Sequence, residues 1–119
     1  MTTPTNRDSY AEMQAAVQAF HDKHRFKSTG GEDLPYRVTL MAEELGEIAS
    51  AVTRGRPVEE LAAECADLMI LLIGTAISAD IDLTEAFWQN MERLMERPAV
   101  TTRDRVRMSG RFGYTGDAS

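Results

Sequence analysis

Two short groups of carboxylate side chains are the residues of this 119-residue chain best suited to chemistry. They occupy residues 43–47 and 64–67. Residues three apart on a helix lie on the same face, so helical segments would pair acids within each group. These pairs are Glu44 with Glu47, and Glu64 with Asp67. Magnesium prefers oxygen ligands, so four acids from two facing helices predict a Mg²⁺ site, with Mn²⁺ as a substitute.

Either acidic group alone is also common on solvated helix faces. Asp67 is harder to explain in that way, because its neighbours Ala66, Leu68 and Ile70 are apolar and an unpaired buried carboxylate is costly. The alternative to a metal ion is an ion pair between Asp67 and an arginine. Candidate arginines are Arg37, Arg93 and Arg97. From the residues alone, both explanations stay open.

Four main helices are expected to position these acids. The first is capped by Asp8 or Ser9 and runs to about residue 25, and a glycine-rich loop follows over 28–35. The next two run over about 36–53 and 57–78, and the fourth opens with a capping box at 82–85 and ends near 97. Because the connection at 54–57 is short, the second and third helices should pack antiparallel.

The third helix is apolar nearly all round from Leu61 to Ile77, apart from its two acids. A helix that is apolar on every face is buried on every face, which in a small chain implies a subunit interface. Gly46 weakens the second helix and could let another backbone or a ligand come close. We therefore predict an all-α four-helix bundle, assembled as a homodimer or homotetramer, with no strands. The helical domain would cover 1–97, with 1–7 disordered, and 98–119 would be a partly ordered tail.

Composition narrows the classes of function. The chain has 13 Lys and Arg against 19 Asp and Glu, and its net charge of −6 argues against nonspecific nucleic-acid binding. Cys65 is the single cysteine, so an intrachain disulfide or a cysteine zinc cage is excluded. The amino terminus lacks the apolar core of a signal peptide, and no apolar run approaches the roughly 20 residues of a membrane span. We expect a soluble cytoplasmic protein with neither nucleic acid nor membrane as a partner.

The two acidic groups together carry a family resemblance. Glu43-Glu44-x-x-Glu47, sixteen intervening residues, and Glu64-x-x-Asp67 resemble the EExxE…ExxD signature of the MazG-like all-α nucleoside triphosphate pyrophosphohydrolases, over about residues 10–97. This resemblance implies a helical dimer or tetramer that uses Mg²⁺ to convert (d)NTPs to (d)NMP and pyrophosphate. It implies that water attacks the α-phosphorus and that Glu43 orients this water or serves a second ion. The implied Mg²⁺ ligands are Glu44, Glu47, Glu64 and Asp67.

The resemblance also implies where the nucleotide binds. Phe26 stands where the family stacks an aromatic residue on the base, although tryptophan is more usual there, and Lys23 is close enough in sequence to reach phosphates. Asn90, Arg93 and Arg97 share one face of the fourth helix and would reach the phosphates in the same way. The alternative for the two arginines is pairing with nearby acids, which stabilises a helix by only about 0.3–0.5 kcal/mol per pair.

The leading functional hypothesis is a house-cleaning pyrophosphohydrolase that removes noncanonical or excess (d)NTPs. Phosphoribosyl-ATP pyrophosphatase, an enzyme with the same superfamily motif, ranks second, because the long first helix and the loop before Glu43 fit the MazG-like pattern better. A third hypothesis is a non-enzymatic, dimerising helical module whose acids are ion-paired or solvated.

Overall fold

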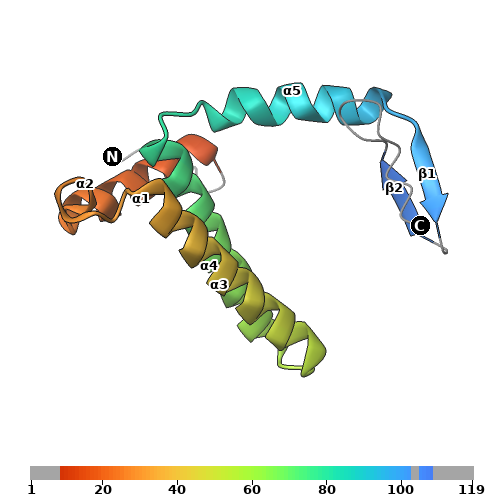
Figure 1. The fold of residues 1–119 in the computed structure, drawn as a ribbon, viewed down its shortest axis with the longest axis horizontal. Helices are drawn as coiled ribbons and strands as arrows, with labels where there is room; N and C mark the ends of the chain where they lie inside the picture. Colours follow the sequence, from red (N-terminus) through yellow and green to blue (C-terminus); the bar gives the residue numbers. More distant parts are fainter. Residues whose placement is uncertain (1–8, 103–104, 109–119) are drawn as a thin grey trace, which may run out of the picture. The chain divides into compact units, whose positions relative to one another are not determined.

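The computed structural model describes residues 9–102 and 105–108, which fall into two compact units, Met1–Asp82 and Leu83–Ser119. Each unit is described by itself. The first contains α1 (Tyr10–Lys23), α2 (Phe26–Thr29), α3 (Leu34–Thr53) and α4 (Val58–Ser78). The second contains α5 (Leu83–Glu96), β1 (Ala99–Thr102) and β2 (Arg105–Met108) (Figure 1). All four predicted helices are confirmed, with ends within about two residues of those expected.

The first helix begins at the predicted cap and ends slightly early. The Ala11 amide donates to the hydroxyl of Ser9, with 3.2 Å between nitrogen and oxygen. After Lys23 the backbone turns, because Arg25 adopts a left-handed conformation with φ of 53°, which a right-handed helix cannot continue. Residues 26–29 of α2 then form a single helical turn that closes at Gly30, where φ is 87°. This turn begins before the predicted loop and takes up the first part of it.

The helix pair α3 and α4 is the frame that carries both acidic groups. Asp33 caps α3 by accepting a hydrogen bond from the Tyr36 amide at 3.3 Å. Gly55 has a φ of 61° in the connection between the two helices, where a left-handed residue reverses the chain. The helices then run side by side in opposite directions (Figure 1), so the predicted antiparallel hairpin is confirmed. α1 packs against α4 as well.

The prediction that α4 is buried on every face is wrong within a single chain. Met69, Ile70 and Leu72 are 47%, 44% and 48% exposed, although all three are large apolar residues. Among the described residues, the buried apolar side chains are Val17, Ala51, Ile73 and Ala76. α4 is also long and apolar enough to cross a membrane by length and composition, which corrects the expectation that no run approaches that length. A core helix of a soluble protein passes the same test, so this finding assigns no location.

The described residues are mainly helical, in agreement with the predicted all-α fold class, and the second unit adds one short pair of strands. β1 and β2 pair antiparallel, with Ala99 opposite Met108 and Thr102 opposite Arg105. The expectation of no strands is therefore wrong for the described part of the tail. Each strand has only four residues, which is too short for an apolar alternation to be visible in the sequence. The predicted disordered lead over 1–7 lies outside the described residues, and the domain division at residue 97 stays a prediction.

Candidate functional site

Three of the predicted acids converge on the facing sides of α3 and α4. Glu44 comes from α3, and Glu64 and Asp67 come from one turn of α4. One carboxylate oxygen from each lies within 4.8 Å of the other two. The spacing of three residues within α4 and the antiparallel hairpin together produce this convergence. The cluster joins acids 20 and 23 residues apart in the sequence.

The charge state of Glu44 reflects this crowding. The pKa of Glu44 is raised, first by a hydrogen bond shared with the carboxyl of Glu64, then by burial, and then by the negative charges of Glu64, Asp67 and Glu47. The second oxygen of Glu44, Oε2, is buried and has no hydrogen-bond partner among the described residues. Buried polar atoms normally have a partner, so this oxygen is an unfilled ligand position.

These features fit a hard divalent cation. The three donors are all carboxylate oxygens, which suit Mg²⁺ or Mn²⁺. The three oxygens are close enough to one another for their carboxylates to share one ion. Glu44, Glu64 and Asp67 are the residues that would hold it.

The remaining predicted acids lie outside this cluster. Glu47 is exposed and is not one of the three converging residues, although its charge helps to raise the pKa of Glu44. Glu43 is exposed on the same helix, next to Glu44. Asp67 is exposed, so the expectation that its apolar neighbours exclude water is wrong. The reason is that neighbours such as Ala66 and Ile70 are themselves exposed, on the side of α4 that lines the apolar groove beside α1.

A cavity of about 570 Å³ lies one helical turn away from the acids on both helices. Leu40 lines it four residues before Glu44 on α3, and Leu71 lines it four residues after Asp67 on α4. Its other lining residues are mainly aromatic or small, and they come from α1, α2, the segment after α2, and the two helices α3 and α4. They are Phe20, His21, Phe26, Thr29, Gly30, Gly31, Tyr36, Arg37 and Ile70.

Phe26, the predicted base-stacking residue, lies in the wall of this cavity. Its ring centroid is 5.3 Å from that of Phe20, 5.0 Å from that of His21 and 5.9 Å from that of His24. Gly31 makes room for the ring, because a Cβ there would come within 2.8 Å of the Cβ of Phe26. Lys23 is exposed and is not among the residues that line the cavity.

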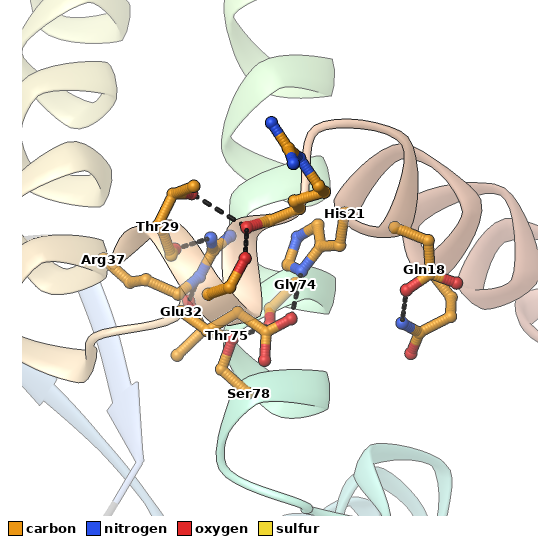
Figure 2. Close-up of polar contacts among 12 residues, drawn as sticks. Gln18, His21, Thr29, Glu32, Arg37, Gly74, Thr75 and Ser78 are labelled. Carbon is orange, nitrogen blue, oxygen red and sulfur yellow. Dashed lines mark hydrogen bonds and ion pairs between the residues drawn. The ribbon is translucent and has the colours of Figure 1, made fainter.

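A buried polar cluster beside the cavity was not predicted from the sequence. Arg37, only 2% exposed, donates to the Thr75 hydroxyl at 3.1 Å, to the Gly31 carbonyl at 2.9 Å and to the Leu71 carbonyl at 3.1 Å. Figure 2 shows His21, Arg37 and Glu32 gathered around the Gly74–Thr75 segment of α4. Arg37 therefore does not pair with Asp67. The available signal was a lone arginine at an apolar-stripe position of α3, three residues before Leu40.

The predicted phosphate contacts of α5 belong to the second unit. Arg93 donates from Nη1 to the side-chain oxygen of Asn90 at 3.4 Å, so these two side chains share a helix face as expected. Arg97 continues that face, and its amide donates to the Arg93 carbonyl. Because the two units are described separately, the role of these three residues toward a nucleotide stays a prediction.

Comparison with known proteins identifies the family. A family model described as phosphoribosyl-ATP pyrophosphohydrolase matches residues 10–94, which include both acidic groups, the aromatic wall of the cavity and most of α5. Searches of curated proteins and of solved structures find no match. Enzymes of this family are hydrolases that use Mg²⁺, in agreement with the oxygen ligands gathered at Glu44, Glu64 and Asp67. The chain belongs to the phosphoribosyl-ATP pyrophosphohydrolase family, within the MazG-like all-α nucleoside triphosphate pyrophosphohydrolase superfamily.

Proposed function

We propose that this protein hydrolyses the bond between the α and β phosphates of a nucleotide, with phosphoribosyl-ATP as the first candidate substrate. The family match supports this substrate and reverses the order given by the sequence, which placed (d)NTPs first. That order depended on a long first helix and a loop before Glu43. α1 ends at Lys23, and α2 takes up the first part of the expected loop, so these features no longer favour (d)NTPs. House-cleaning hydrolysis of (d)NTPs becomes the second candidate.

The unpartnered carboxylate oxygen of Glu44 is the observation that carries this proposal. It lies inside a cluster in which two further carboxylates, from Glu64 and Asp67, raise the pKa of the same residue. Three such groups close together favour either a proton or a cation. A bound Mg²⁺ ion would neutralise phosphate charge and stabilise the charge that develops on the leaving pyrophosphate. We assign Glu47, whose charge also reaches Glu44, to the outer edge of this site.

Glu43 is our candidate for orienting the attacking water. Its carboxylate is exposed and lies next to Glu44 on α3, so water can reach it. In the proposed reaction a water oxygen forms a bond to the α-phosphorus while the bond from that phosphorus to the bridging oxygen breaks. Glu43 accepts the proton from water and returns it to solvent. The products are a nucleoside monophosphate, or phosphoribosyl-AMP, and pyrophosphate.

We place the base of the substrate in the cavity beside Phe26. The cavity is one helical turn from the acids on both α3 and α4. A nucleotide with its phosphates at the acids can therefore reach the cavity with its base. The rings of Phe20, Phe26 and Tyr36 give the cavity aromatic walls. Stacking on such rings stabilises a bound base by about 1–3 kcal/mol and tolerates different bases. The cavity therefore supports the binding of nucleotides in general and does not favour one particular base.

The non-enzymatic alternative requires acids that are ion-paired or simply solvated. The acids of the cluster take no part in the ion pairs of His21 with Glu32 and of Arg56 with Glu60. Pairing therefore does not account for the cluster. Solvation accounts for Asp67, which is exposed, but not for the buried oxygen of Glu44.

A substrate panel with product identification tests the function. Purified protein is incubated with phosphoribosyl-ATP, ATP and the (d)NTPs, each with Mg²⁺, with Mn²⁺ or with a chelator. We expect metal-dependent release of pyrophosphate, fastest with phosphoribosyl-ATP. Faster turnover of a (d)NTP would favour the second candidate. No hydrolysis of any substrate, together with no metal-dependent rise in melting temperature, would support the non-enzymatic module.

We also propose that a second copy of the chain covers the outer face of the helix pair. Large apolar side chains such as Leu45, Val52 and Leu72 are exposed on α3 and α4, and a soluble chain rarely leaves many of them uncovered. α4 also bears Glu59, Glu60 and its two cluster acids, which disfavour insertion into a bilayer. Light scattering on the eluted protein should give a dimer or tetramer. A stable monomer, or recovery only with membranes, would contradict this assembly and the cytoplasmic location.

A further inference from the structure

We propose that Arg37 is a positioning residue that sets the register of α3 against α4, and so brings Glu44 to Glu64 and Asp67. This role rests on the proposed metal site. Arg37 lies in α3, and two of its three hydrogen bonds cross to α4, at the Leu71 carbonyl and the Thr75 hydroxyl. The third goes to the Gly31 carbonyl, in the segment that precedes α3.

The spacing along the two helices links these bonds to the acids. Arg37 is seven residues before Glu44 on α3, and Leu71 is seven residues after Glu64 on α4. Seven residues are about two turns of a helix, so each helix carries the arginine contact and the acidic contact on one face. Because α3 and α4 are antiparallel, the two contacts match in register along the hairpin. A slip by one turn, about 5.4 Å, would lose both contacts together.

Arg37 can enforce this register because its burial is costly in any other arrangement. Burial lowers the pKa of Arg37, and the nearby Glu32 and Tyr36 oppose that effect. A buried charge without hydrogen bonds is strongly disfavoured, so a shifted register that removed its acceptors would be penalised. The apolar contacts of Leu40 and Ala51 along the same helix have no such directional requirement. The arginine therefore supplies the specificity that the apolar packing lacks.

Gly74 provides the space that Arg37 occupies on α4. A Cβ at this position would collide with Nη2 of Arg37 and would come within 2.6 Å of Nε2 of His21. His21 is buried, and its Nδ1 lies 3.2 Å from a carboxylate oxygen of Glu32 (Figure 2). The His21–Glu32 pair thus bounds one side of the space that the Arg37 guanidinium occupies. On the α4 side, the absence of a side chain at Gly74 leaves room for the guanidinium.

The test compares metal affinity in three variants, with Mn²⁺ binding followed by electron paramagnetic resonance. Arg37→Leu keeps an apolar volume but removes all three hydrogen bonds. Thr75→Val keeps the shape of the side chain and removes the acceptor for Nε of Arg37. Ile73→Ala is the control, because Ile73 is 3% exposed on α4 and lines the apolar groove against α1 rather than the acids. All measurements are made where circular dichroism shows parent-like helicity.

We expect Arg37→Leu to weaken Mn²⁺ binding about 10–100-fold, as losing a residue that supports metal ligands commonly does. Thr75→Val should also weaken Mn²⁺ binding, but by less. This variant tests the positioning role of Arg37 if Arg37→Leu does not fold. Ile73→Ala should lower the melting temperature and leave Mn²⁺ affinity within about twofold, since cavity formation costs stability away from the acids.

Three outcomes would overturn the proposal, and only the third also overturns the proposed metal site. If Arg37→Leu and Thr75→Val bind Mn²⁺ as the parent does, Arg37 has no positioning role and the metal site stands. If Ile73→Ala weakens Mn²⁺ binding as much as Arg37→Leu does, the loss follows from general destabilisation and register is not involved. If the parent protein binds no Mn²⁺, the proposed metal site fails, and the positioning role fails with it.

Discussion

Replacing Gly74 with alanine should destabilise the protein, although the same change stabilises most helices. Gly74 lies in the interior of α4 and is buried. A Cβ there would overlap Nη2 of Arg37 and lie 2.6 Å from Nε2 and 2.9 Å from Cε1 of His21. Neither neighbour can move freely, because Arg37 makes three hydrogen bonds and His21 contacts Glu32. The added methyl group must therefore displace a buried cation or a buried ring.

The size of the effect follows from three opposing contributions. Alanine in place of glycine inside a helix gains about 1 kcal/mol. Forcing an extra methyl group into a packed interior costs about 1–3 kcal/mol. Loss of even one hydrogen bond of Arg37 costs about 1.5–3 kcal/mol more, because the donor is charged and buried. The net loss is about 1.5–5 kcal/mol, or about 6–20 °C in melting temperature at roughly 4 °C per kcal/mol for a domain of this size.

Gly46→Ala is the matched control for this measurement. Gly46 is also inside a long helix, α3, but a Cβ at this position has nothing within 4 Å. It should therefore gain the full helix-propensity term of about 1 kcal/mol and melt about 4 °C higher than the parent. Thermal and urea denaturation followed by circular dichroism measure both variants. If the melting temperature of Gly74→Ala is equal to or above that of the parent, or if both variants shift it alike, Gly74 is not in tight contact with Arg37.

Four further predictions concern the site itself. Asp67→Asn should abolish pyrophosphate release and the rise in melting temperature with Mn²⁺ while leaving helicity intact; near-full turnover would show that the metal lies elsewhere. Glu43→Gln should reduce turnover far more than Mn²⁺ affinity, whereas equal losses would make Glu43 a ligand. The folded-state pKa of Glu44 is raised, so protonated Glu44 stabilises the folded protein. This stabilisation is fully present below the ordinary pKa of 4.5 and is lost as pH rises through the raised pKa. With a chelator present, Glu44→Gln should therefore reduce the dependence of the free energy of unfolding on pH, measured by urea denaturation from about pH 4 to 7. An unchanged dependence would contradict the raised pKa of Glu44. Phe26→Leu should raise KM for the nucleotide several-fold with little change in kcat, and a loss confined to kcat would remove Phe26 from the base site.

The helices and the meeting of the acids could be predicted because local signals determine them. The three-to-four spacing of apolar residues and the cap at Ser9 located the helices to within about two residues. The short connection around Gly55 required an antiparallel pair, and the spacing of Glu64 and Asp67 placed both acids on its inner side. Those features need no knowledge of distant contacts.

The features that escaped prediction depend on contacts that the sequence does not display. Arg37 is a lone cation at an apolar-stripe position, and the acceptors on α4 that explain its burial are 34 and 38 residues away in the sequence. Asp67 is exposed although its neighbours in the sequence are apolar, because neighbours such as Ala66 and Ile70 are themselves exposed in a single chain. Glu47 shares a face with Glu44 by spacing, but the side chains of α4 converge on Glu44 alone.

The short elements escaped for a different reason. α2 is a single turn of four residues, and periodicity cannot be recognised over one turn. The strands β1 and β2 are equally short and hold as many arginines and threonines as apolar residues. Their pairing is defined by backbone hydrogen bonds, for which the side-chain pattern gives no clear signal.

The position of an oxygen label from water tests the central claim most directly. The protein, with Mg²⁺, hydrolyses phosphoribosyl-ATP or the best substrate of the panel in ¹⁸O-enriched water, and phosphorus NMR follows the products. The account predicts pyrophosphate as the released product and the label in the monophosphate, because water attacks the α-phosphorus at the cluster of Glu44, Glu64 and Asp67. Label in pyrophosphate, or release of orthophosphate, would contradict it.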